Sequence, residues 1–450
     1  MPARAGGKVG ALSQMSFKAE PYWWEDRGWN REALVAREVP ESCDAVVVGA
    51  GITGVMAAWR MAQAGLSVVV LEQGMLGQGA SSRNNGMVVP YLKPSPHELE
   101  KRFGPEGAVP YLNGGETAFH FVRDLIRDRG LDCDLEDNER FVIANRPGDM
   151  AHLVELAEAY NARSDEVTWT ALSSDEVLEQ TEVAGSEGGV LVRGTYCLHP
   201  GKYHARLVEL AHAAGVRFVE KAEVTEIGAE GKSVSVRGRA APIRAGRVVV
   251  ATNGYTGGFA GWLRRRIIPV RAYMACSEPV APEVMARLFP PARSVTVAKR
   301  NLFWMRTSPD GTRVMFGGRA GACRGGLMRK AEDLKADVVA AYPELKDMGV
   351  SHCWEGVLGF SFGQLPHVGT MNGVHYAAGF SGVGLTFGSW LGDQLGRLAA
   401  GEEVTAGPFL SSAFETRPYY FGQPWFLPLV IAKMNAADRL DAWRQGRGKG

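Results

Sequence analysis

The clearest hydrophobic pattern of the chain lies over residues 45–73. Residues 45–48 form a short, fully apolar run, which is typical of a buried strand in a parallel sheet. A helical pattern with small apolar side chains on one face follows and ends at Gly65. A second apolar run, 68–71, is closed by Glu72. The pattern predicts a strand, a helix and a second strand in that order.

Three glycines join the first of these strands to the helix, with the spacing G-x-G-x-x-G. Gly49 permits a tight turn, Gly51 lets the backbone approach a pyrophosphate, and Gly54 lets the helix pack closely on the strand. Glu72 stands where its carboxylate can accept hydrogen bonds from a ribose. A glycine-rich turn alone can be purely structural, but here every part of a dinucleotide site occurs in order. The pattern does not separate NAD from FAD.

A second glycine pattern lies over residues 376–401, where an apolar run leads through a turn into a helix. Gly384, Gly388, Gly392 and Gly396 recur every four residues, so one face of that helix is bare backbone. Four glycines in a helix interior would cost about 1 kcal/mol each relative to alanine. We therefore expect this face to pack closely against another element, although a plain glycine-rich helix is the alternative.

Further elements alternate between these two patterns. A helix is predicted over 201–215, strands over 216–227 and 232–238, and a buried strand before Thr252. Residues 303–319 read as a hairpin that turns at Ser308–Gly311. The expected fold is mixed α/β (α+β), with a Rossmann-like dinucleotide-binding domain on a parallel sheet and an antiparallel-sheet substrate domain. The predicted division is an N-terminal aromatic strap (1–39), a discontinuous dinucleotide-binding domain (40–100, 200–260, 350–405), a substrate domain (101–199, 261–349) and a C-terminal tail with an amphipathic helix (406–450).

Composition narrows the classes of partner. The chain has 450 residues and a formal net charge of +1, which gives no electrostatic reason to expect nucleic acid. The apolar run at 425–432 is too short to span a bilayer, and the first residues lack a secretory pattern. The six cysteines and nine histidines form no metal-binding spacing, so we predict no metal and a reducing, cytoplasmic location.

A Gly/Ser/Asn-rich stretch, "MLGQGASSRNNGMVVPYL" at 75–92, follows the first motif and offers many backbone N–H groups. With both glycine motifs, the sequence resembles the D-amino-acid oxidase-like superfamily of FAD-dependent amine oxidoreductases. This superfamily includes glycine oxidase, sarcosine oxidase and γ-glutamylputrescine oxidoreductase, and the similarity is greatest to the last branch. The aromatic segment at 21–29, "PYWWEDRGW", is similar to the lead-in of that branch and is physically an apolar strap that needs a groove.

The resemblance implies bound FAD and a set of contacts to it. Glu72 would bind the adenosine ribose, Val224 would contact adenine through its backbone, and the helix N-terminus at 384–386 would face the flavin pyrimidine ring. Gly356 stands where sarcosine oxidase has its flavin-linking cysteine, so we predict non-covalent FAD. The predicted cofactor residues are Gly49, Gly51, Ile52, Thr53, Gly54, Glu72, Gln73, Gly79, Ala80, Ser81, Ser82, Arg83, Asn85, Gly86, Met87, Val224, Thr252, Asn253, Gly254, Gly356, Gly379, Ser381, Gly382, Val383, Gly384, Leu385 and Thr386.

The implied reaction is hydride transfer to flavin from a carbon that bears nitrogen, after which water hydrolyses the imine. No acid or base is obligatory if the amine arrives neutral, so we predict no catalytic residue. Aromatic walls would keep the site dry and stabilise a cationic amine, while each such residue could equally belong to the core. The pocket candidates are Tyr273, Met274, Phe303, Trp304, Phe360, Phe362 and His367.

Departures from the family pattern shape the substrate prediction. Leu358 occupies the position of the arginine that binds the substrate carboxylate in glycine and D-amino-acid oxidases, which favours a primary or secondary amine without an α-carboxylate. Arg306 or Arg319 could still face an acidic group. Met315 replaces the lysine that sarcosine oxidase uses to activate oxygen, so oxygen or another acceptor remains open.

Two alternatives to an amine oxidase stay open at this point. One is a dehydrogenase that passes electrons to a quinone or carrier protein. The other is a flavin-bearing subunit of a hetero-complex that is inactive alone. The expected partners are a small-molecule amine and an electron acceptor, with an oligomer possible and no transmembrane segment. The tail at 424–443 is expected to dock on the body of the protein rather than on a partner or a membrane.

Overall fold

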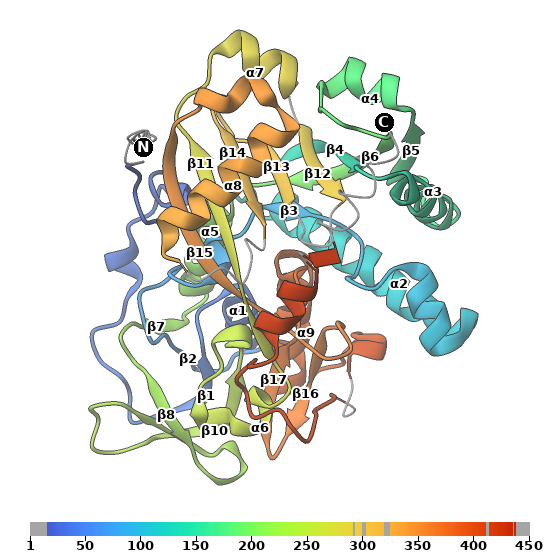
Figure 1. Cartoon of the computed structure of the whole chain (residues 1–450). Coiled ribbons are helices and arrows are strands. Elements are labelled where there is room, and N and C mark those ends of the chain that lie inside the picture. The colour runs from blue at the N-terminus through green and yellow to red at the C-terminus, as the bar shows by residue number, and fades with distance from the viewer. Residues whose placement is uncertain are drawn as a thin grey trace, which may run out of the picture.

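The structure is a computed structural model that describes residues 16–290, 293–298, 303–318, 325–410, 414–434 and 436–437. Two β-sheets lie one above the other in Figure 1, with helices packed on their faces. The mixed α/β fold expected from the sequence is confirmed. Among the described helices, none is both long and apolar enough to cross a membrane.

The first sheet has a parallel core. Strands β10, β1, β2 and β7 run parallel in that order, β17 adds in parallel beside β10, and the others pair antiparallel. The apolar run at 45–48 is paired on both sides in the middle of this sheet, and its side chains are buried because they pack alternately into the cores on the two faces of the sheet. The strands are β1 (Ser42–Val48), β2 (Val68–Leu71), β7 (Arg217–Val219), β8 (Val224–Ile227), β9 (Ser233–Val236), β10 (Ile243–Val250), β16 (His367–Met371) and β17 (Val374–Ala378).

Helices α1 (Ile52–Gln63) and α9 (Gly384–Ala400) pack against each other beside this sheet (Figure 1). A Cβ added to Gly392 would lie 2.8 Å from the Thr53 carbonyl oxygen, and one added to Gly396 would lie 2.7 Å from the Ala57 carbonyl oxygen. Only glycine permits this approach of one backbone to the other. The close packing predicted from the glycine spacing is confirmed.

The second sheet is mostly antiparallel, with one parallel pair between β4 and β12. Its order is β15-β11-β14-β13-β12-β4-β6-β3, and β5 pairs with β6. The predicted turn at Ser308–Gly311 joins β13 to β14, with the Gly311 amide donating to the Ser308 carbonyl at 2.9 Å. The strands are β3 (Met87–Val88), β4 (Glu136–Ala144), β5 (Thr168–Leu172), β6 (Gly189–Cys197), β11 (Ile268–Ser277), β12 (Arg293–Ala298), β13 (Phe303–Thr307), β14 (Val314–Gly318) and β15 (Val350–Phe360).

Two of these strands bear on the predicted domain division. β3 and β15 lie within the ranges assigned from the sequence to the FAD-binding domain, yet both pair in the second sheet. A sequence pattern predicts that a segment is a strand but not which strand it pairs with. For this reason the sheet that contains β3 and β15 differs from the one expected. The division into domains otherwise stays a prediction.

Helices cover both sheets. α2 is broken at Gly104, whose φ of 75° is left-handed, and α7 and α8 cover the outer face of the second sheet (Figure 1). The C-terminal tail is helical over 427–434, and Leu429 there is 67% exposed, so its predicted docking on the body stays a prediction. The remaining helices are α2 (Pro96–Asp128), α3 (Pro147–Asn161), α4 (Ser174–Thr181), α5 (Pro200–Ala213), α6 (Gly261–Arg264), α7 (Pro282–Leu288) and α8 (Leu327–Ala341).

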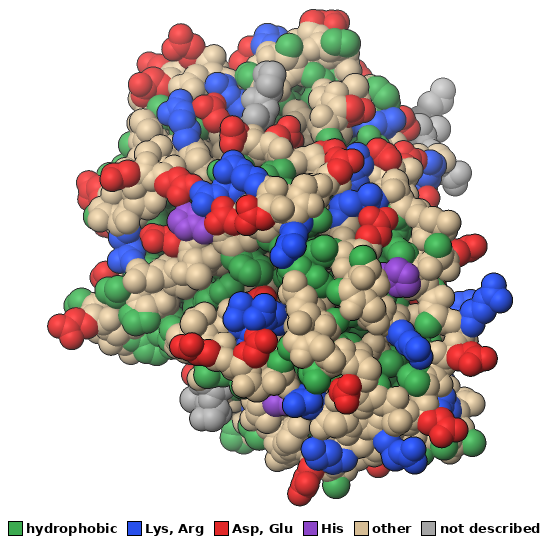
Figure 2. Space-filling view, turned by 180° about the vertical axis from the view of Figure 1, so that it is seen from behind, with side chains coloured by type: hydrophobic (Ala, Val, Ile, Leu, Met, Phe, Trp, Pro, Cys, Tyr) green, Lys and Arg blue, Asp and Glu red, His purple; other side chains and the backbone are tan. Residues whose placement is uncertain are grey.

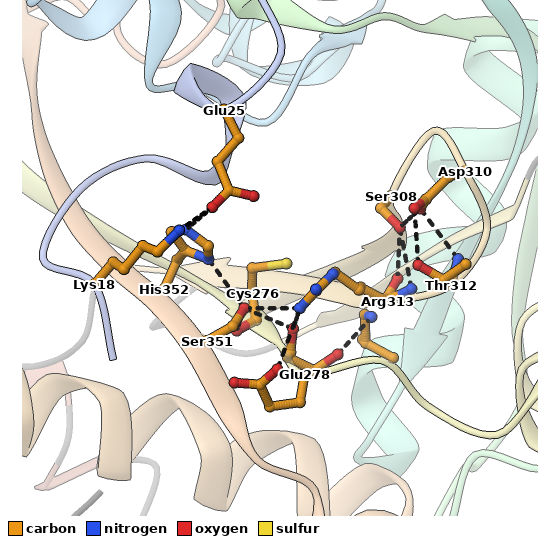
Figure 3. A network of polar contacts seen from close by, with 12 residues as sticks. Lys18, Glu25, Cys276, Glu278, Ser308, Asp310, Thr312, Arg313, Ser351 and His352 are labelled. Carbon is orange, nitrogen blue, oxygen red and sulfur yellow. Dashed lines mark hydrogen bonds and ion pairs between the residues drawn. The ribbon is translucent and has the colours of Figure 1, made fainter. Parts of the chain in front are cut away.

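The N-terminal strap is fastened to the second sheet. The Lys18 amide donates to the Ser351 carbonyl at 2.9 Å, and the Cys353 amide donates to the Lys18 carbonyl at 3.0 Å. His352 Nε2 lies 3.2 Å from a Glu25 carboxylate oxygen, a contact that Figure 3 shows beside the ion pair between Lys18 and Glu25. These contacts hold the strap residues that follow against the same sheet.

Candidate active site

A cavity of about 1420 Å³ lies between the two sheets. This volume exceeds the range of about 300–1,000 Å³ that is usual for small-ligand sites, so a dinucleotide and a substrate could share it. It is lined by the carboxyl ends of β1 and β2, by the loop after β2, by the start of α9 and by one face of the second sheet. Figure 2 shows hydrophobic side chains gathered in a recess across the middle of one face of the molecule.

The turn after β1 leaves open backbone at the cavity wall. Gly49 adopts a left-handed φ of 100°, and a Cβ on Gly51 would lie only 3.0 Å from the Ser81 hydroxyl oxygen. A Cβ on Gly54 would lie 2.0 Å from the Gly49 carbonyl oxygen, so this glycine allows the helix to pack on the turn, as predicted. The turn thus presents backbone rather than side chains to a ligand.

Glu72 holds this turn together from the end of β2. Its carboxylate accepts hydrogen bonds from the Ala50 amide and from the Gly74 amide, each at 3.0 Å. The Ile52 amide at the start of α1 donates to Ser81 at 2.9 Å. The first motif and the loop after β2 are therefore connected by hydrogen bonds at the place where both line the cavity.

The strap packs directly on the loop at 77–86. The Trp24 indole Nε1 donates to the Ser82 hydroxyl at 3.0 Å, and the Trp23 indole Nε1 donates to the Asn84 carbonyl at 2.9 Å. The Trp24 ring lies between two guanidinium groups, with Arg27 at 4.4 Å and Arg83 at 4.6 Å from its centroid. Burial, together with repulsion from Arg83 and Arg31, lowers the pKa of Arg27 to about 10.

His204, on α5, also holds the turn after β1. Its Nε2 lies 2.7 Å from the Ala50 carbonyl oxygen, so this nitrogen carries the proton and Nδ1 is bare. Nδ1 is buried without a hydrogen-bond partner among the described residues. Burial lowers the pKa of His204 to about 4, which keeps the ring neutral beside the turn.

The start of α9 reaches the cavity from the opposite side. Ser381 has a left-handed φ of 52°, and its hydroxyl donates to the Gly379 carbonyl at 2.9 Å, which fixes the turn before the helix. The Gly379 amide donates to the Asn253 side-chain oxygen at 3.0 Å. The first-turn amides of a helix this long carry a partial positive charge, which here is directed at the cavity wall.

Most of the predicted cofactor residues line this one cavity: Gly49, Gly51, Ile52, Thr53, Glu72, Gln73, Gly79, Ala80, Ser81, Arg83, Asn85, Met87, Val224, Thr252, Asn253, Gly356, Ser381, Gly382, Val383, Gly384 and Leu385. Residues far apart in the sequence are therefore brought together. Their roles toward FAD stay predictions.

Six predicted cofactor residues lie behind the wall instead: Gly54, Ser82, Gly86, Gly254, Gly379 and Thr386. Each supports the wall by packing or hydrogen bonding. A Cβ on Gly86 would lie 2.0 Å from the Leu198 carbonyl oxygen, and one on Gly254 would lie 3.0 Å from Leu358. The Thr386 hydroxyl accepts from the amide of Val89 at 3.3 Å, and it is Val89 rather than Thr386 that lines the cavity.

Four of the seven pocket candidates line the cavity, namely Tyr273, Met274, Trp304 and Phe360. Phe303 does not, because alternate side chains of β13 point to opposite faces and Phe303 packs in the outer core with Phe316. Phe362 lies under Arg417 and contacts Tyr420 instead. His367 is stacked on Phe414 with ring centroids 4.0 Å apart, and it is also absent from the described lining.

The two arginines considered for an acidic group have other positions. Arg306 is buried, and it donates to the Asn85 and Leu198 carbonyls and pairs with Glu136 at 3.2 Å. Arg319 lies outside the described residues. Sequence reasoning missed Arg140, which lines the cavity from β4. In the sequence, Arg140 is distinguished only by lying two residues before Val142, and therefore on the same face of a strand, which is a weak signal.

The arrangement fits a dinucleotide on structural grounds. Bare backbone at Gly51, a carboxylate at the end of β2 and helix first-turn amides at α1 and α9 converge on one space. Beyond them the wall turns apolar and aromatic at Met274 and Trp304. Such a site can hold a phosphate-bearing cofactor at one end and an organic substrate at the other.

Comparison with known proteins agrees with this geometry. The chain is 28% identical over 389 residues to gamma-glutamylputrescine oxidoreductase from Escherichia coli (strain K12), a match covering 84% of this chain and 87% of that protein. It is 24% identical over 394 residues to the probable oxidoreductase OrdL from Rhizobium meliloti (strain 1021), covering 85% and 89%. Glycine oxidase from Geobacillus kaustophilus shares the fold with a TM-score of 0.68 at 19% identity, covering 84% of this chain and all of that one.

The family model for FAD dependent oxidoreductases, DAO, matches residues 44–398, which includes both glycine motifs and the whole wall of the cavity formed by the first sheet. Members of this family are enzymes that use FAD, and the relatives matched by sequence and by fold include amine and amino-acid oxidoreductases. The chain therefore belongs to the DAO family of FAD-dependent oxidoreductases.

Proposed function

We propose that this protein oxidises the C–N bond of a primary or secondary amine with non-covalently bound FAD. The observation that carries the proposal is that one cavity is lined from both sheets. The glycine turn after β1 and Glu72 line it on one side, and Met274 and Trp304 of the second sheet line it on the other. The name of one relative, gamma-glutamylputrescine oxidoreductase, supports an amine as the substrate.

The residues of the first sheet would hold the cofactor. The amides after β1 would face the pyrophosphate, Glu72 would accept from the adenosine ribose, and the amides of Gly384 and Leu385 would stabilise negative charge on the reduced ring. When bound, FAD supplies the capacity to accept a hydride from the carbon next to nitrogen. Non-covalent binding is proposed because Gly356 lines the cavity and, by the family resemblance, stands where sarcosine oxidase has its flavin-linking cysteine.

The second sheet would bind and orient the substrate. Met274 and Trp304 would exclude water from the reacting carbon, and the aromatic face of Trp304 would favour an amine in its cationic form before it loses a proton. Tyr273 also lines the cavity, but its ring packs with the outer core and lies 5.4 Å from Lys330 Nζ. Because a neutral amine needs no further base, positioning is the main contribution of these residues. The imine that leaves the site is hydrolysed by water to a carbonyl compound.

A substrate without an α-carboxylate is supported by Leu358, which lines the cavity. By the family resemblance, this is the position of the arginine that binds the substrate carboxylate in glycine and D-amino-acid oxidases. Met315 supports a second candidate for the acceptor. By the family resemblance it replaces the lysine that sarcosine oxidase uses to activate oxygen, and here it is fully buried in the apolar cluster with Trp354 and does not line the cavity. We therefore propose a quinone or carrier protein as the alternative acceptor to oxygen.

A single-turnover assay tests this proposal. The holoenzyme is mixed under nitrogen with propylamine or putrescine, and carbonyl product and reduced flavin are counted together. One carbonyl per reduced flavin supports C–N oxidation, and reduced flavin without carbonyl product contradicts it. Admitting air or a soluble quinone afterwards distinguishes an oxidase from a dehydrogenase by the rate of flavin reoxidation.

A further inference from the structure

Arg140 is a cation at the cavity wall, and its hydrogen-bond partners in the part of the chain that the structure describes are neutral. It lies on β4, and its Nε donates to the Thr296 hydroxyl on β12 at 3.1 Å. Its Nη1 donates to the Tyr91 hydroxyl at 2.6 Å. Arg140, Thr296 and Tyr91 all line the cavity. The guanidinium group is thus oriented by two hydroxyl groups and faces the space where a substrate would lie.

No carboxylate among the described residues pairs with Arg140. Its neighbours in the sheet behave differently, because Arg193 pairs with Glu139 at 2.9 Å and Arg293 pairs with the same carboxylate at 3.1 Å. Arginine stays protonated in proteins and has five N–H donors, of which Thr296 and Tyr91 take only two. A half-buried cation with free donors and no acid partner is a site for an anion.

The wall around Arg140 is rigid and aromatic. Tyr160 and Trp169 are stacked with centroids 4.8 Å apart, and Tyr91 lies 5.6 Å from each of them. Burial raises the pKa of Tyr160, so this phenol stays neutral and does not compete for the guanidinium charge. These rings fix the Tyr91 hydroxyl that orients Arg140.

Arg140 shares its face of the sheet with the proposed substrate wall. Val142 lies two residues further along β4 and is paired with Thr296 of β12. Thr296 is in turn paired with Trp304 of β13. All of these line the cavity. Four strands separate β15, which carries Leu358, from β4 in the sheet order, so Leu358 and Arg140 lie far apart across the sheet.

We propose that Arg140 binds a carboxylate carried by the amine substrate, at the part of the sheet that lies away from Leu358. The free edge of the guanidinium matches the two oxygens of a carboxylate, which is the geometry of bidentate pairs. This inference rests on the proposed function and deepens it, because it names the substrate class as an amine that bears a carboxylate elsewhere than on the oxidised carbon. Arg140 is a binding and specificity residue in this account.

Binding without turnover is the first test. Butyrate, valerate and caproate are titrated into the oxidised holoenzyme, and the perturbation of the visible flavin spectrum gives a dissociation constant. Replacing Arg140 with glutamine (R140Q) should weaken binding roughly 10- to 100-fold, the range for lost hydrogen bonds to a charged group. R140K keeps the positive charge but lacks the paired N–H donors of the guanidinium group, so binding should be weakened less than in R140Q. R193Q, which removes an exposed arginine of the same sheet, should leave binding unchanged.

Flavin reduction under nitrogen is the second test, with propylamine, butylamine and pentylamine compared with γ-aminobutyrate, δ-aminovalerate and ε-aminocaproate. The wild type and R193Q should be reduced faster by the carboxylate-bearing member of at least one pair, and R140Q should lose that preference. Equal preference and equal carboxylate binding in the wild type and R140Q would overturn the inference while amine oxidation stands. Carboxylate binding that depends on Arg140, without reduction by any amine, would instead overturn the proposed function alone.

Discussion

The Trp24 indole Nε1 donates a hydrogen bond of 3.0 Å to the hydroxyl of Ser82, which in turn donates to the Gly77 carbonyl. This contact joins the N-terminal strap to the loop that lines the cavity at 77–81. The strap lies outside the residues 44–398 matched by the family model, yet it supports the loop from which FAD binding is expected. Strap and cofactor binding should therefore be coupled.

Replacing Trp24 with phenylalanine tests this coupling. The change keeps a ring between Arg27 and Arg83 but removes the N–H donor, and one hydrogen bond is worth about 0.5–1.5 kcal/mol. The dissociation constant of FAD should rise roughly threefold to tenfold, measured by FAD fluorescence on titration into the apoprotein. W425F, at an indole that is 62% exposed, serves as the control, and equal affinity of both variants would show that the strap does not act on the loop.

Replacing Glu72 with glutamine should weaken FAD binding more strongly. The carboxylate accepts from the amides of Ala50 and Gly74, and a neutral amide would hold both less well. It would also lose the charge-assisted bonds that we propose Glu72 makes to the ribose. We expect a rise in the FAD dissociation constant of roughly 10- to 100-fold. Isothermal titration of the apoprotein measures it. An E72Q protein that binds FAD as tightly as the wild type contradicts the placement of the ribose.

Gly392 should not tolerate alanine. A Cβ there would lie 2.7 Å from the Met56 Cβ and 2.8 Å from the Thr53 carbonyl oxygen, so α9 would have to move off α1. Overpacking of this kind costs about 1–3 kcal/mol. Urea unfolding of G392A should show that loss. G148A is the matched control, because Gly148 lies in α3 with nothing near its Cβ position, and there alanine should be neutral or stabilising.

The protein should lose stability as the pH falls from about 6.5 to about 4. Burial lowers the pKa values of His199, His204 and His367 to about 4 in the folded state, below the ordinary value of 6.5. In that window the unfolded chain binds protons that the folded chain does not, so the free energy of unfolding decreases by up to about 1.4 kcal/mol per pH unit for each histidine.

Urea unfolding across this pH range, with FAD in fixed excess, measures the slope. H204Q keeps a donor for the Ala50 carbonyl but cannot titrate, so its slope should be shallower than that of the wild type. H212Q changes an exposed histidine of α5 and should leave the slope unchanged. Identical slopes in all three proteins would contradict the buried neutral state of His204.

The sequence was informative where the chemistry is local. Gly49, Gly51 and Gly54 lie within one turn, and Glu72 ends the very next strand, so their spacing alone predicted their arrangement. The four-residue glycine period of α9 also predicted a close helix contact, although it did not identify α1 as the partner.

Sequence reasoning failed where the answer depended on which face of a strand is buried. Phe303 and Trp304 are adjacent aromatic residues of β13, and only the packing of α8 behind the sheet turns Trp304 toward the cavity and Phe303 away from it. Arg140 was missed for the same reason. Its significance comes from the lack of an ion pair with any carboxylate among the described residues, which spacing along one strand cannot reveal.

The central claim is that FAD in this cavity is reduced by an amine. The most direct measurement is the visible spectrum of the purified holoenzyme under nitrogen while alkylamines, polyamines, amino acids, ω-amino carboxylates and amino-phosphonates are added singly. The account predicts loss of the oxidised flavin band with an amine lacking an α-carboxylate, and no loss with glycine or alanine. A protein that binds no FAD, or bound flavin that no amine reduces, would contradict it.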